Sequence, residues 1–387
     1  MTALDDSVIR RIASWGPGTV ATSLYLDVDG QRHPRWSDVE RRADQLFRAA
    51  RKQARLLAAS GTEAEVEAEI AEMRTWLDRI LDRSATRGVA LFSRAGKGLF
   101  EAVQSTVPVR DQVVVDPEPD IAQLCVVAAT SWSAIAIALD RERWQVVRLE
   151  QDGRARELDV LEDTMPRAVD IDIELAGFGR HEEELARAHF RRVARVAAAE
   201  LARQPADHLV LLGTEDSVAE LEGYLPRAVA DHVAGRRHLH GKASTKELVA
   251  AARAIVEDVE RERRSAVLAA LRQRATTTGT SVVTGLDATL AALGAGQVAT
   301  LVVERTFEAP GGRCEECRLL VVRARRCPRC GGRVNRIGNV VDAAVADAFL
   351  HHGALDPVDD GALFDLGRIG ALARRWAAEA TGGAGDA

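Results

Sequence analysis

The sequence predicts a multidomain α/β protein, of the α+β type, with three domains. Its 387 residues are more than one hydrophobic core usually supports. Short alternating apolar runs, typical of strands, lie between long stretches in which apolar residues recur at helical spacing. Four of the five cysteines lie close together near the C-terminal end. We therefore expect domains at 1–120, 121–262 and 263–376, with a cysteine ribbon inserted at 311–335 and a disordered tail at 377–387.

The composition and the N-terminal segment exclude several classes of protein. An apolar fraction of 47% excludes wholesale disorder. Residues 1–15 contain Asp5, Asp6, Arg10 and Arg11 and no uninterrupted apolar core, so we expect neither a signal peptide nor a transit sequence. No stretch approaches the roughly 18 apolar residues of a membrane-spanning helix, and we expect a cytoplasmic protein. The net charge of −6 argues against a globally basic nucleic-acid binder but allows local basic surfaces.

The first domain is expected to combine strands with a helical hairpin. Apolar Leu24 and Leu26 alternate with their neighbours, which is typical of a half-buried strand. In the hairpin, the first arm is basic and the second is acidic. The two arms could face each other through ion pairs, but we favour two solvated helix faces. The elements are expected at 22–28 (strand), 46–57 and 66–80 (helices), 89–92 and 100–103 (strands) and 116–120 (linker).

The second domain is expected to open with an antiparallel meander and to continue with alternating helices and strands. Cys125 lies in the first strand of the meander and is expected to be a small buried hydrophobe. The meander strands are expected at 124–129, 134–139, 144–149 and 155–160. They are followed by a glycine-bearing loop at 174–180, a long helix at 181–203, a strand at 209–212 and a long helix at 244–274. The third domain is expected to contain a helix at 284–293, a strand at 298–303, a helix at 339–351 capped by Gly353 and an apolar stretch at 369–372.

The cysteine segment has the form of a zinc ribbon with two knuckles. Cys314 and Cys317 form the first pair, and Cys327 and Cys330 form the second pair after nine intervening residues. Each pair, on a tight turn, aims two thiolates at one tetrahedral ion. Four thiolates leave no open coordination position, so we expect one structural Zn²⁺ and no catalytic metal. Four free core cysteines are the alternative, which the charged residues between the pairs disfavour.

Arginines are concentrated in the cysteine segment. Eight arginines lie from Arg313 to Arg336, against Glu315 and Glu316. Such a patch on an acidic protein is best explained by contact with phosphate, and a solvated basic face is the alternative. The RNA contacts are expected from Arg323, Arg325, Arg326 and Arg329.

A second basic surface is expected on the long helix after His181. Arg187, Arg191 and Arg195 follow at spacings of four residues, so they share one stripe, with Arg192 beside it. Apolar residues supply another face of this helix, and a plain amphipathic helix would look similar. The cluster at 236–242 is a weaker basic patch with the same ambiguity.

We expect no catalytic residues. The sequence contains no phosphate-binding loop of the nucleotide-hydrolase kind and no serine or cysteine nucleophile motif. His181 and His189 lie eight residues apart on a helix and are expected to be surface residues, not a dyad.

Two segments of the third domain carry a family resemblance. Residues 285–303, from Gly-Leu-Asp-Ala-Thr-Leu to Thr-Leu-Val-Val, and residues 367–374, Gly-Arg-Ile-Gly-Ala-Leu-Ala-Arg, resemble the opening and the end of the third domain in the archaeo-eukaryotic peptide-chain release factor and Pelota family. The order of elements over residues 124–374 is similar to that family's second and third domains, whereas the first domain matches poorly. Archaeal members carry a comparable four-cysteine knuckle. The resemblance implies a third domain like the kink-turn-binding ribosomal proteins, an α/β sandwich with an inserted zinc ribbon, in a bacterial offshoot related to Balon-type hibernation factors.

Two departures from the family bear on activity. Its release factors present Gly-Gly-Gln on the loop before the long helix of the central domain, where the glutamine orients water at the peptidyl-tRNA ester. In this chain the equivalent loop has no glutamine, and the first domain lacks the Asn-Ile-Lys-Ser-type motif that reads stop codons. Hydrolysis directed by a stop codon is therefore not expected. The residues equivalent to the release loop are Gly177, Phe178, Gly179, Arg180 and His181.

The resemblance implies a tRNA-shaped, ribosome-binding factor that occupies the A site in translational rescue or hibernation. Its partners would be ribosomal RNA and a translational GTPase such as elongation factor Tu, and we expect a monomer without membrane contact. The first alternative is a peptidyl-tRNA hydrolase or nuclease with His181 as acid or base, which cleavage lost on His181→Ala would favour. The second is an RNA-binding regulatory module unrelated to the ribosome, which sucrose-gradient sedimentation would separate from the other two.

Overall fold

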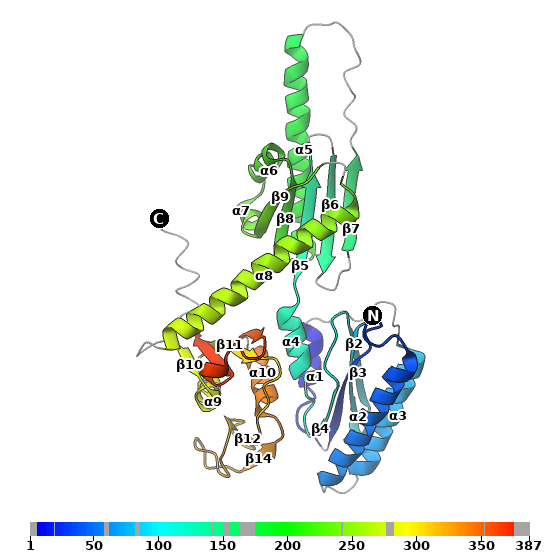
Figure 1. Cartoon of the computed structure of the whole chain (residues 1–387), viewed down its shortest axis with the longest axis vertical. Helices are drawn as coiled ribbons and strands as arrows, with labels where there is room; N and C mark the ends of the chain where they lie inside the picture. The colour runs from blue at the N-terminus through cyan, green and yellow to red at the C-terminus, as the bar shows by residue number, and fades with distance from the viewer. Residues whose placement is uncertain are drawn as a thin grey trace. The chain divides into compact units, whose positions relative to one another are not determined.

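The computed structural model describes residues 6–18, 20–57, 62–81, 86–140, 143–150, 155–162, 175–240, 243–275, 282–351 and 353–374. The chain divides into two compact units, whose helices and strands are labelled in Figure 1. Unit 1 comprises Met1–Thr130 and Leu268–Ala387, and unit 2 comprises Ser131–Val267. The chain is thus a multidomain α/β protein with several sheets, which confirms the predicted fold class. Within the described ranges, no helix combines the length and apolarity needed to cross a membrane.

Four strands near the N-terminus form an antiparallel sheet in the order β3-β2-β1-β4. The elements of this part are α1 (Asp6–Ala13), β1 (Ala21–Asp27), α2 (Trp36–Leu56), α3 (Thr62–Arg79), β2 (Gly88–Arg94), β3 (Leu99–Ser105), β4 (Gln112–Asp116) and α4 (Ala122–Thr130). α2 and α3 pack on one face of the sheet, and α1 and α4 pack on the other. Because both faces are covered, all seven residues of β1 are buried, and the strand is not the half-buried one predicted at 22–28.

Ion pairs join the two arms of the helical hairpin formed by α2 and α3. Arg51 Nε lies 2.5 Å from Glu67 Oε1, and Arg55 Nε lies 3.3 Å from Glu63 Oε2. The preference for two separately solvated faces is therefore wrong, because the basic arm and the acidic arm face each other. Exposed pairs of this kind contribute about 0.2–1 kcal/mol each, so the apolar face of the hairpin supplies most of its stability.

The apolar segment after the linker is a helix, not the strand predicted at 124–129. The Ala122 N–H donates to Asp120 Oδ1 at 3.0 Å, so Asp120 caps the start of α4. A short apolar run does not distinguish a buried strand from a buried helix by its periodicity, which explains the wrong prediction. Cys125 is fully buried in α4, as predicted.

A second four-stranded sheet, in the order β10-β16-β11-β15, forms the C-terminal part of unit 1. Its elements are β10 (Val282–Thr284), α9 (Leu286–Gly294), β11 (Val298–Glu304), α10 (Val340–Leu350), β15 (Ala354–Val358), η2 (Phe364–Leu366) and β16 (Ile369–Ala373). β11 pairs in parallel with β15 and antiparallel with β16. The capping residue of α10 is His351 and not Gly353, whose N–H donates to Ala348 O at 2.9 Å. The predicted tail at 377–387 lies outside the described residues.

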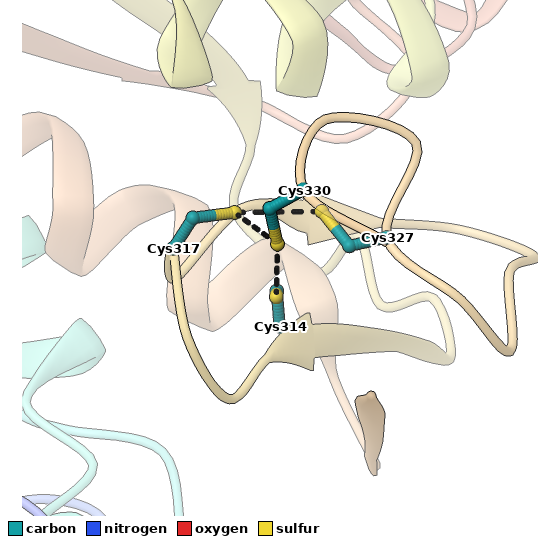
Figure 2. A group of neighbouring side chains, drawn as sticks. All are labelled: Cys314, Cys317, Cys327 and Cys330. Atoms are coloured by element: carbon teal, nitrogen blue, oxygen red, sulfur yellow. Dashed lines mark hydrogen bonds between the residues drawn. The ribbon is translucent and has the colours of Figure 1, made fainter. Parts of the chain in front are cut away.

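A small three-stranded sheet is inserted between β11 and α10, in the order β13-β12-β14. It consists of β12 (Gly311–Cys314), β13 (Leu320–Val321) and β14 (Val334–Ile337). Of the four clustered cysteines, Cys314 ends β12, and the other three lie on the turns and loops that follow (Figure 2). Leu320 packs with Leu290 of α9 and with Val340 and Ala344 of α10. The insertion, which we call the ribbon, therefore has an apolar anchor on the domain that carries it.

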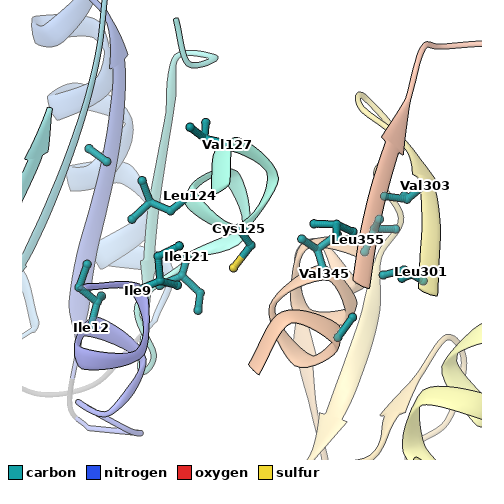
Figure 3. Packing of buried hydrophobic residues seen from close by; sticks show 14 of the residues in the cluster. Ile9, Ile12, Ile121, Leu124, Cys125, Val127, Leu301, Val303, Val345 and Leu355 are labelled. Carbon is teal, nitrogen blue, oxygen red and sulfur yellow. The ribbon is translucent and has the colours of Figure 1, made fainter. Parts of the chain in front are cut away.

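One hydrophobic core joins the N-terminal and C-terminal parts of unit 1 (Figure 3). Ile9 of α1 and Leu124 and Cys125 of α4 belong to the same cluster as Val345 of α10 and Leu355 of β15. Figure 3 shows Cys125 on the side of α4 that faces Val345 and Leu355. Each Å² of apolar surface buried in this cluster contributes about 25 cal/mol to stability. The N-terminal and C-terminal parts of unit 1 are therefore held together by shared apolar packing as well as by the chain that connects them.

Unit 2 is built on a five-stranded sheet in the order β7-β6-β5-β8-β9. Its elements are β5 (Ser133–Leu139), β6 (Arg143–Glu150), β7 (Ala155–Glu162), α5 (Leu175–Arg203), β8 (His208–Gly213), α6 (Glu215–Glu222), α7 (Arg227–Ala230), β9 (Val233–His238) and the part of α8 (Thr245–Ala275) up to Val267. β5, β6 and β7 form the predicted antiparallel meander, and β8 is parallel to β5. α5, α6 and α7 pack on one face of the sheet, and α8 packs on the other.

Glu69 of α3 is a buried carboxyl group, although the sequence places it on the acidic arm of the hairpin. Its side chain is fully buried, with Oε2 accepting from Thr22 Oγ1 at 2.5 Å and Oε1 accepting from the Ala95 N–H at 3.0 Å. Burial raises the pKa of Glu69 to about 7, and these hydrogen bonds to the carboxylate offset part of that rise.

We predict that Glu69→Gln flattens the dependence of unfolding free energy on pH. The pKa of Glu69 is about 7 in the folded state against an ordinary 4.5, so its favourable contribution is complete below pH 4.5 and is lost as the pH rises through 7. The loss is on the order of 3 kcal/mol by pH 8, at roughly 1.4 kcal/mol per pKa unit. Glutamine mimics the protonated carboxyl, so the variant is expected to be more stable than the wild type at pH 8 and similar at pH 5. Urea unfolding at both pH values measures this, with the exposed Glu63→Gln as control; equal pH dependence in wild type and Glu69→Gln would contradict the assignment.

Candidate metal centre and nucleic-acid interface

The four cysteines of the ribbon converge on one point. Their Sγ atoms all lie within 4.8 Å of one another, and Figure 2 shows the four side chains directed towards each other. The Sγ atoms of Cys314 and Cys330 are 3.5 Å apart, those of Cys317 and Cys327 are 3.4 Å apart, and those of Cys317 and Cys330 are 3.6 Å apart. A tetrahedral ion with metal–sulfur bonds of about 2.3 Å requires sulfur–sulfur distances of about 3.8 Å. The arrangement therefore fits a metal ion held by four thiolates.

The two cysteine pairs lie on equivalent turns. The Arg318 N–H donates to Cys314 O at 3.2 Å, and the Gly331 N–H donates to Cys327 O at 2.9 Å. The residue after each pair has a left-handed backbone, with φ of 63° at Arg318 and 75° at Gly331. Each turn thus presents its two sulfur atoms in the same way, as two knuckles around one ion require.

Backbone amides point at the sulfur atoms of the second knuckle. The Gly332 N–H donates to Cys330 Sγ at 3.4 Å, as expected for the glycines after this pair. Desolvation opposes ionisation of Cys327, but hydrogen bonds from the amides of Cys330 and Arg329 and from the neighbouring thiols bring its pKa down to about 6. The hydrogen bond from the Gly332 amide opposes the effect of the neighbouring thiols on the pKa of Cys330, but those thiols raise it to about 12. The amide hydrogen bonds themselves favour the thiolate form that binds metal.

The eight arginines of the ribbon do not form one free basic patch. Arg313 Nη1 donates to Glu118 Oε2 at 2.7 Å, and Arg318 pairs with the same carboxylate. Arg313 Nη2 also donates to Asp347 Oδ1 at 3.2 Å. These two arginines are therefore bound within unit 1 and are not available to phosphate. Glu118 and Asp347 were not predicted as partners, because no local pattern connects residues so far apart in the sequence.

The four ribbon arginines predicted to contact RNA are exposed. Arg326 Nη1 donates to Gly331 O at 3.4 Å, and Arg329 donates to Gly294 O of α9. These carbonyl contacts leave the positive charges uncompensated. In the described part of the chain, no carboxylate pairs with Arg323 or Arg325. Arg333 Nε lies 3.9 Å from Glu315 Oε1, and Arg336 is exposed. Four of the five exposed ribbon arginines that pair with no carboxylate among the described residues therefore lie at 323–329.

The arginines of α5 form an exposed stripe opposite a buried face. Arg187, Arg191 and Arg195 are exposed, whereas Phe190 and Val193 between them are fully buried against the sheet. The Arg191 guanidinium lies over the Tyr224 ring at 5.6 Å, and that of Arg192 lies over the Trp144 ring at 6.0 Å. Stacking on aromatic rings orients a guanidinium and leaves its outer edge open to a phosphate.

The other predicted basic patch is partly neutralised. Arg236 of β9 pairs with Glu222 of α6, while Arg237 and His238 are exposed on this edge strand of the sheet. Lys242 lies outside the described residues.

The residues equivalent to a release loop adopt helical backbone. α5 begins at Leu175, so Gly177 to His181 lie in its first turns and not in the loop expected at 174–180. Their side chains lie outside the described residues. Glycine in a helix is unfavourable by about 1 kcal/mol, but no proline is present to prevent the helix from extending over this segment. His189, the other histidine considered, packs edge-on against Phe190 with ring centroids 5.7 Å apart.

The central part of the chain is similar to a known protein family. Residues 119–257 match the model of the bacterial archaeo-eukaryotic release factor family 10, which confirms the resemblance to release factors for this segment. The match covers α4 and most of unit 2 and ends before the four ribbon cysteines. No curated protein sequence matches the chain.

Several solved structures are similar to the chain at low sequence identity. The archaeal translation termination factor aRF1 is 17% identical, with 96% of this chain and 99% of that chain covered and a TM-score of 0.28. Pelota from Archaeoglobus fulgidus is 15% identical, with coverages of 76% and 81% and a TM-score of 0.30. Dom34 from S. cerevisiae, a translation termination-like factor, is 7% identical, with coverages of 74% and 80% and a TM-score of 0.42.

We predict that the purified protein binds about one metal ion per chain and that Cys327→Ser loses it, because three thiolates hold a closed four-ligand site far more weakly. The ribbon at 311–335 should then become sensitive to protease while unit 2 stays folded. Elemental analysis by plasma mass spectrometry and limited proteolysis measure the two effects. Cys125→Ala, which removes a buried cysteine outside the site, should keep the metal. Full metal content in Cys327→Ser, or a metal-free wild type with an intact ribbon, would contradict the assignment.

Proposed function

We propose that this chain, whose residues 119–257 match a release-factor family, binds the ribosome and occupies its A site in translational rescue or hibernation without releasing peptide. The family match is the observation that carries the proposal. Two exposed arginine surfaces supply the physical means, one on α5 of unit 2 and one on the ribbon of unit 1. On a chain with a net charge of −6, such local surfaces favour binding to RNA phosphates over nonspecific attraction of the whole molecule.

The α5 stripe is suited to contact with the RNA backbone. Residues at spacings of four rise by about 6 Å along a helix, so Arg187, Arg191 and Arg195 present three guanidinium groups along one edge. Guanidinium groups bind phosphate through paired, charge-assisted hydrogen bonds. Structured RNA is recognised largely through its shape and backbone, which needs no base-specific residues.

We assign the metal centre a structural role with Zn²⁺ as its ion. Four sulfur ligands without nitrogen or oxygen favour zinc, and a closed four-coordinate site leaves no position for water or substrate. The bound ion would fix both knuckles and so hold the loop that carries Arg323, Arg325 and Arg326. In this proposal the ribbon holds the exposed arginines in place and has no catalytic role.

We propose that the protein is not an enzyme. The five residues equivalent to the release loop contain no glutamine, and the side chain most suited to acid or base chemistry there is His181. These five residues contain no carboxylate that could orient a histidine and no nucleophile that it could activate, and a hydrolase site of this kind requires both. We therefore favour a protein that acts by occupying the ribosomal A site over one that cleaves peptidyl-tRNA.

We predict that two triple variants, R187A/R191A/R195A and R323A/R325A/R326A, each weaken ribosome binding and reduce its salt dependence. If each arginine contacts one phosphate, the slope of log affinity against log potassium concentration falls by about 2 units, at roughly 0.7 per contact. Metal content stays unchanged in the second variant, because none of its residues is a ligand. Binding is measured by cosedimentation with ribosomes over a range of potassium concentrations.

A matched control tests whether position or net charge causes the effect. R41A/R48A/R55A removes three exposed arginines from α2 and changes the net charge by the same amount. Its salt slope is expected to stay at the wild-type value. Wild-type slopes in both test variants, or equal loss in the control, would show that the two surfaces are solvated and that RNA binding lacks this physical basis.

A further inference from the structure

The linker between β4 and α4 is held firmly by the N-terminal part of unit 1. Arg94 is fully buried, and its Nη2 donates to Pro117 O at 2.6 Å and to Gly16 O at 2.8 Å. The Gly18 N–H donates to the same Pro117 carbonyl at 2.9 Å. The Tyr25 hydroxyl donates to Asp120 O at 2.7 Å. Both ends of the short segment 117–120 are thus fixed to the first sheet.

The middle of this linker is held by the ribbon. Glu118 accepts from Arg313 and Arg318, which directly precede and directly follow the first cysteine pair. Arg313 is mostly buried, with 15% of its side chain exposed, and Asp347 of α10 compensates the rest of its charge. The two arginines that flank the metal ligands therefore converge on one carboxylate nearly 200 residues away in the sequence.

Arg318 has a left-handed backbone, which a residue with a side chain adopts at a cost in free energy. The two knuckles have the same turn, and the second carries glycine at the left-handed position, where glycine is the unstrained choice. The first knuckle carries Arg318 there, with φ of 63°, although a residue with a Cβ atom is strained in this conformation. The strain is compensated by the pair with Glu118, which glycine could not form.

We infer that the metal centre acts as a latch on segment 117–130, in which a closed first knuckle positions Arg313 and Arg318 on Glu118. The inference rests on metal binding as proposed above. When the metal leaves, the turn that imposes the backbone of Arg318 opens and both arginines lose their positions. The linker and α4, through which the chain continues into unit 2, then depend on the N-terminal contacts and the apolar core alone. Segment 117–130 is therefore more rigid when the metal is bound than when it is absent.

Hydrogen–deuterium exchange of the full-length, metal-loaded protein tests the latch with Arg318→Gly as the main variant. Glycine removes the guanidinium and relieves the left-handed backbone, so the knuckle and its metal are retained. Amides of 117–130 are expected to exchange roughly tenfold faster than in the wild type, while those of β1 are unchanged. Glu118→Gln should give the same result from the other side of the contact. Arg323→Ala, an exposed arginine of the same ribbon, should leave the exchange at the wild-type rate.

Removal of the metal by a chelator provides the decisive comparison. In the wild type, chelation should accelerate exchange in 117–130 as well as in the ribbon. In Arg318→Gly, it should accelerate exchange in the ribbon fully but in 117–130 less than in the wild type, because only Arg313 still holds Glu118 there. Wild-type exchange in metal-loaded Arg318→Gly, or a ribbon that opens on chelation without any change in 117–130, would overturn the latch while leaving the metal centre intact. A wild type that contains no metal would overturn the metal centre itself, and the latch with it.

Discussion

The apolar helix α4 must be buried on several sides, and this requirement determines how unit 1 is assembled. Its residues Leu124, Cys125 and Val127 lie in a cluster supplied by α1 and the first sheet on one side and by α10 and β15 on the other. Neither end of the chain covers α4 alone, because each contributes only part of that cluster. The linker before α4 is fixed by Arg94, which donates to Pro117 O, and by Arg313, which donates to Glu118. The ribbon therefore lies in contact with the segment that leads into unit 2, although the two are far apart in the sequence.

Much of the fold follows from sequence patterns, and the exceptions have physical causes. The meander, the long helices and the four-cysteine centre are local patterns, so spacing alone predicts them. α4 was predicted as a strand because a short, uniformly apolar segment has no periodicity that separates the two structures. The shared core, the pairs of Arg51 with Glu67 and of Arg313 with Glu118, and the buried Glu69 depend on the tertiary structure. No pattern within a single segment could have indicated them.

The same distinction applies to the candidate RNA surfaces. From the sequence, the eight arginines of the ribbon are predicted to form one basic patch. In the structure, Arg313 and Arg318 instead pair with Glu118 within unit 1. What remains is a smaller surface, concentrated at 323–329 of the ribbon. On α5, the predicted stripe is exposed and backed by a buried apolar face, as an amphipathic helix requires. The net charge of −6 gives the whole chain no attraction to RNA. Two local arginine surfaces, one in each unit, provide positive charge where phosphates can be contacted.

Occupancy of the A site is the central claim, and competition with aminoacyl-tRNA tests it most directly. The fraction of protein bound to ribosomes would be measured by cosedimentation at fixed protein concentration, with the A site either vacant or filled by aminoacyl-tRNA. The account predicts that binding is lost in proportion to A-site filling and returns when the tRNA is removed. Undiminished binding to ribosomes whose A sites are filled would contradict it.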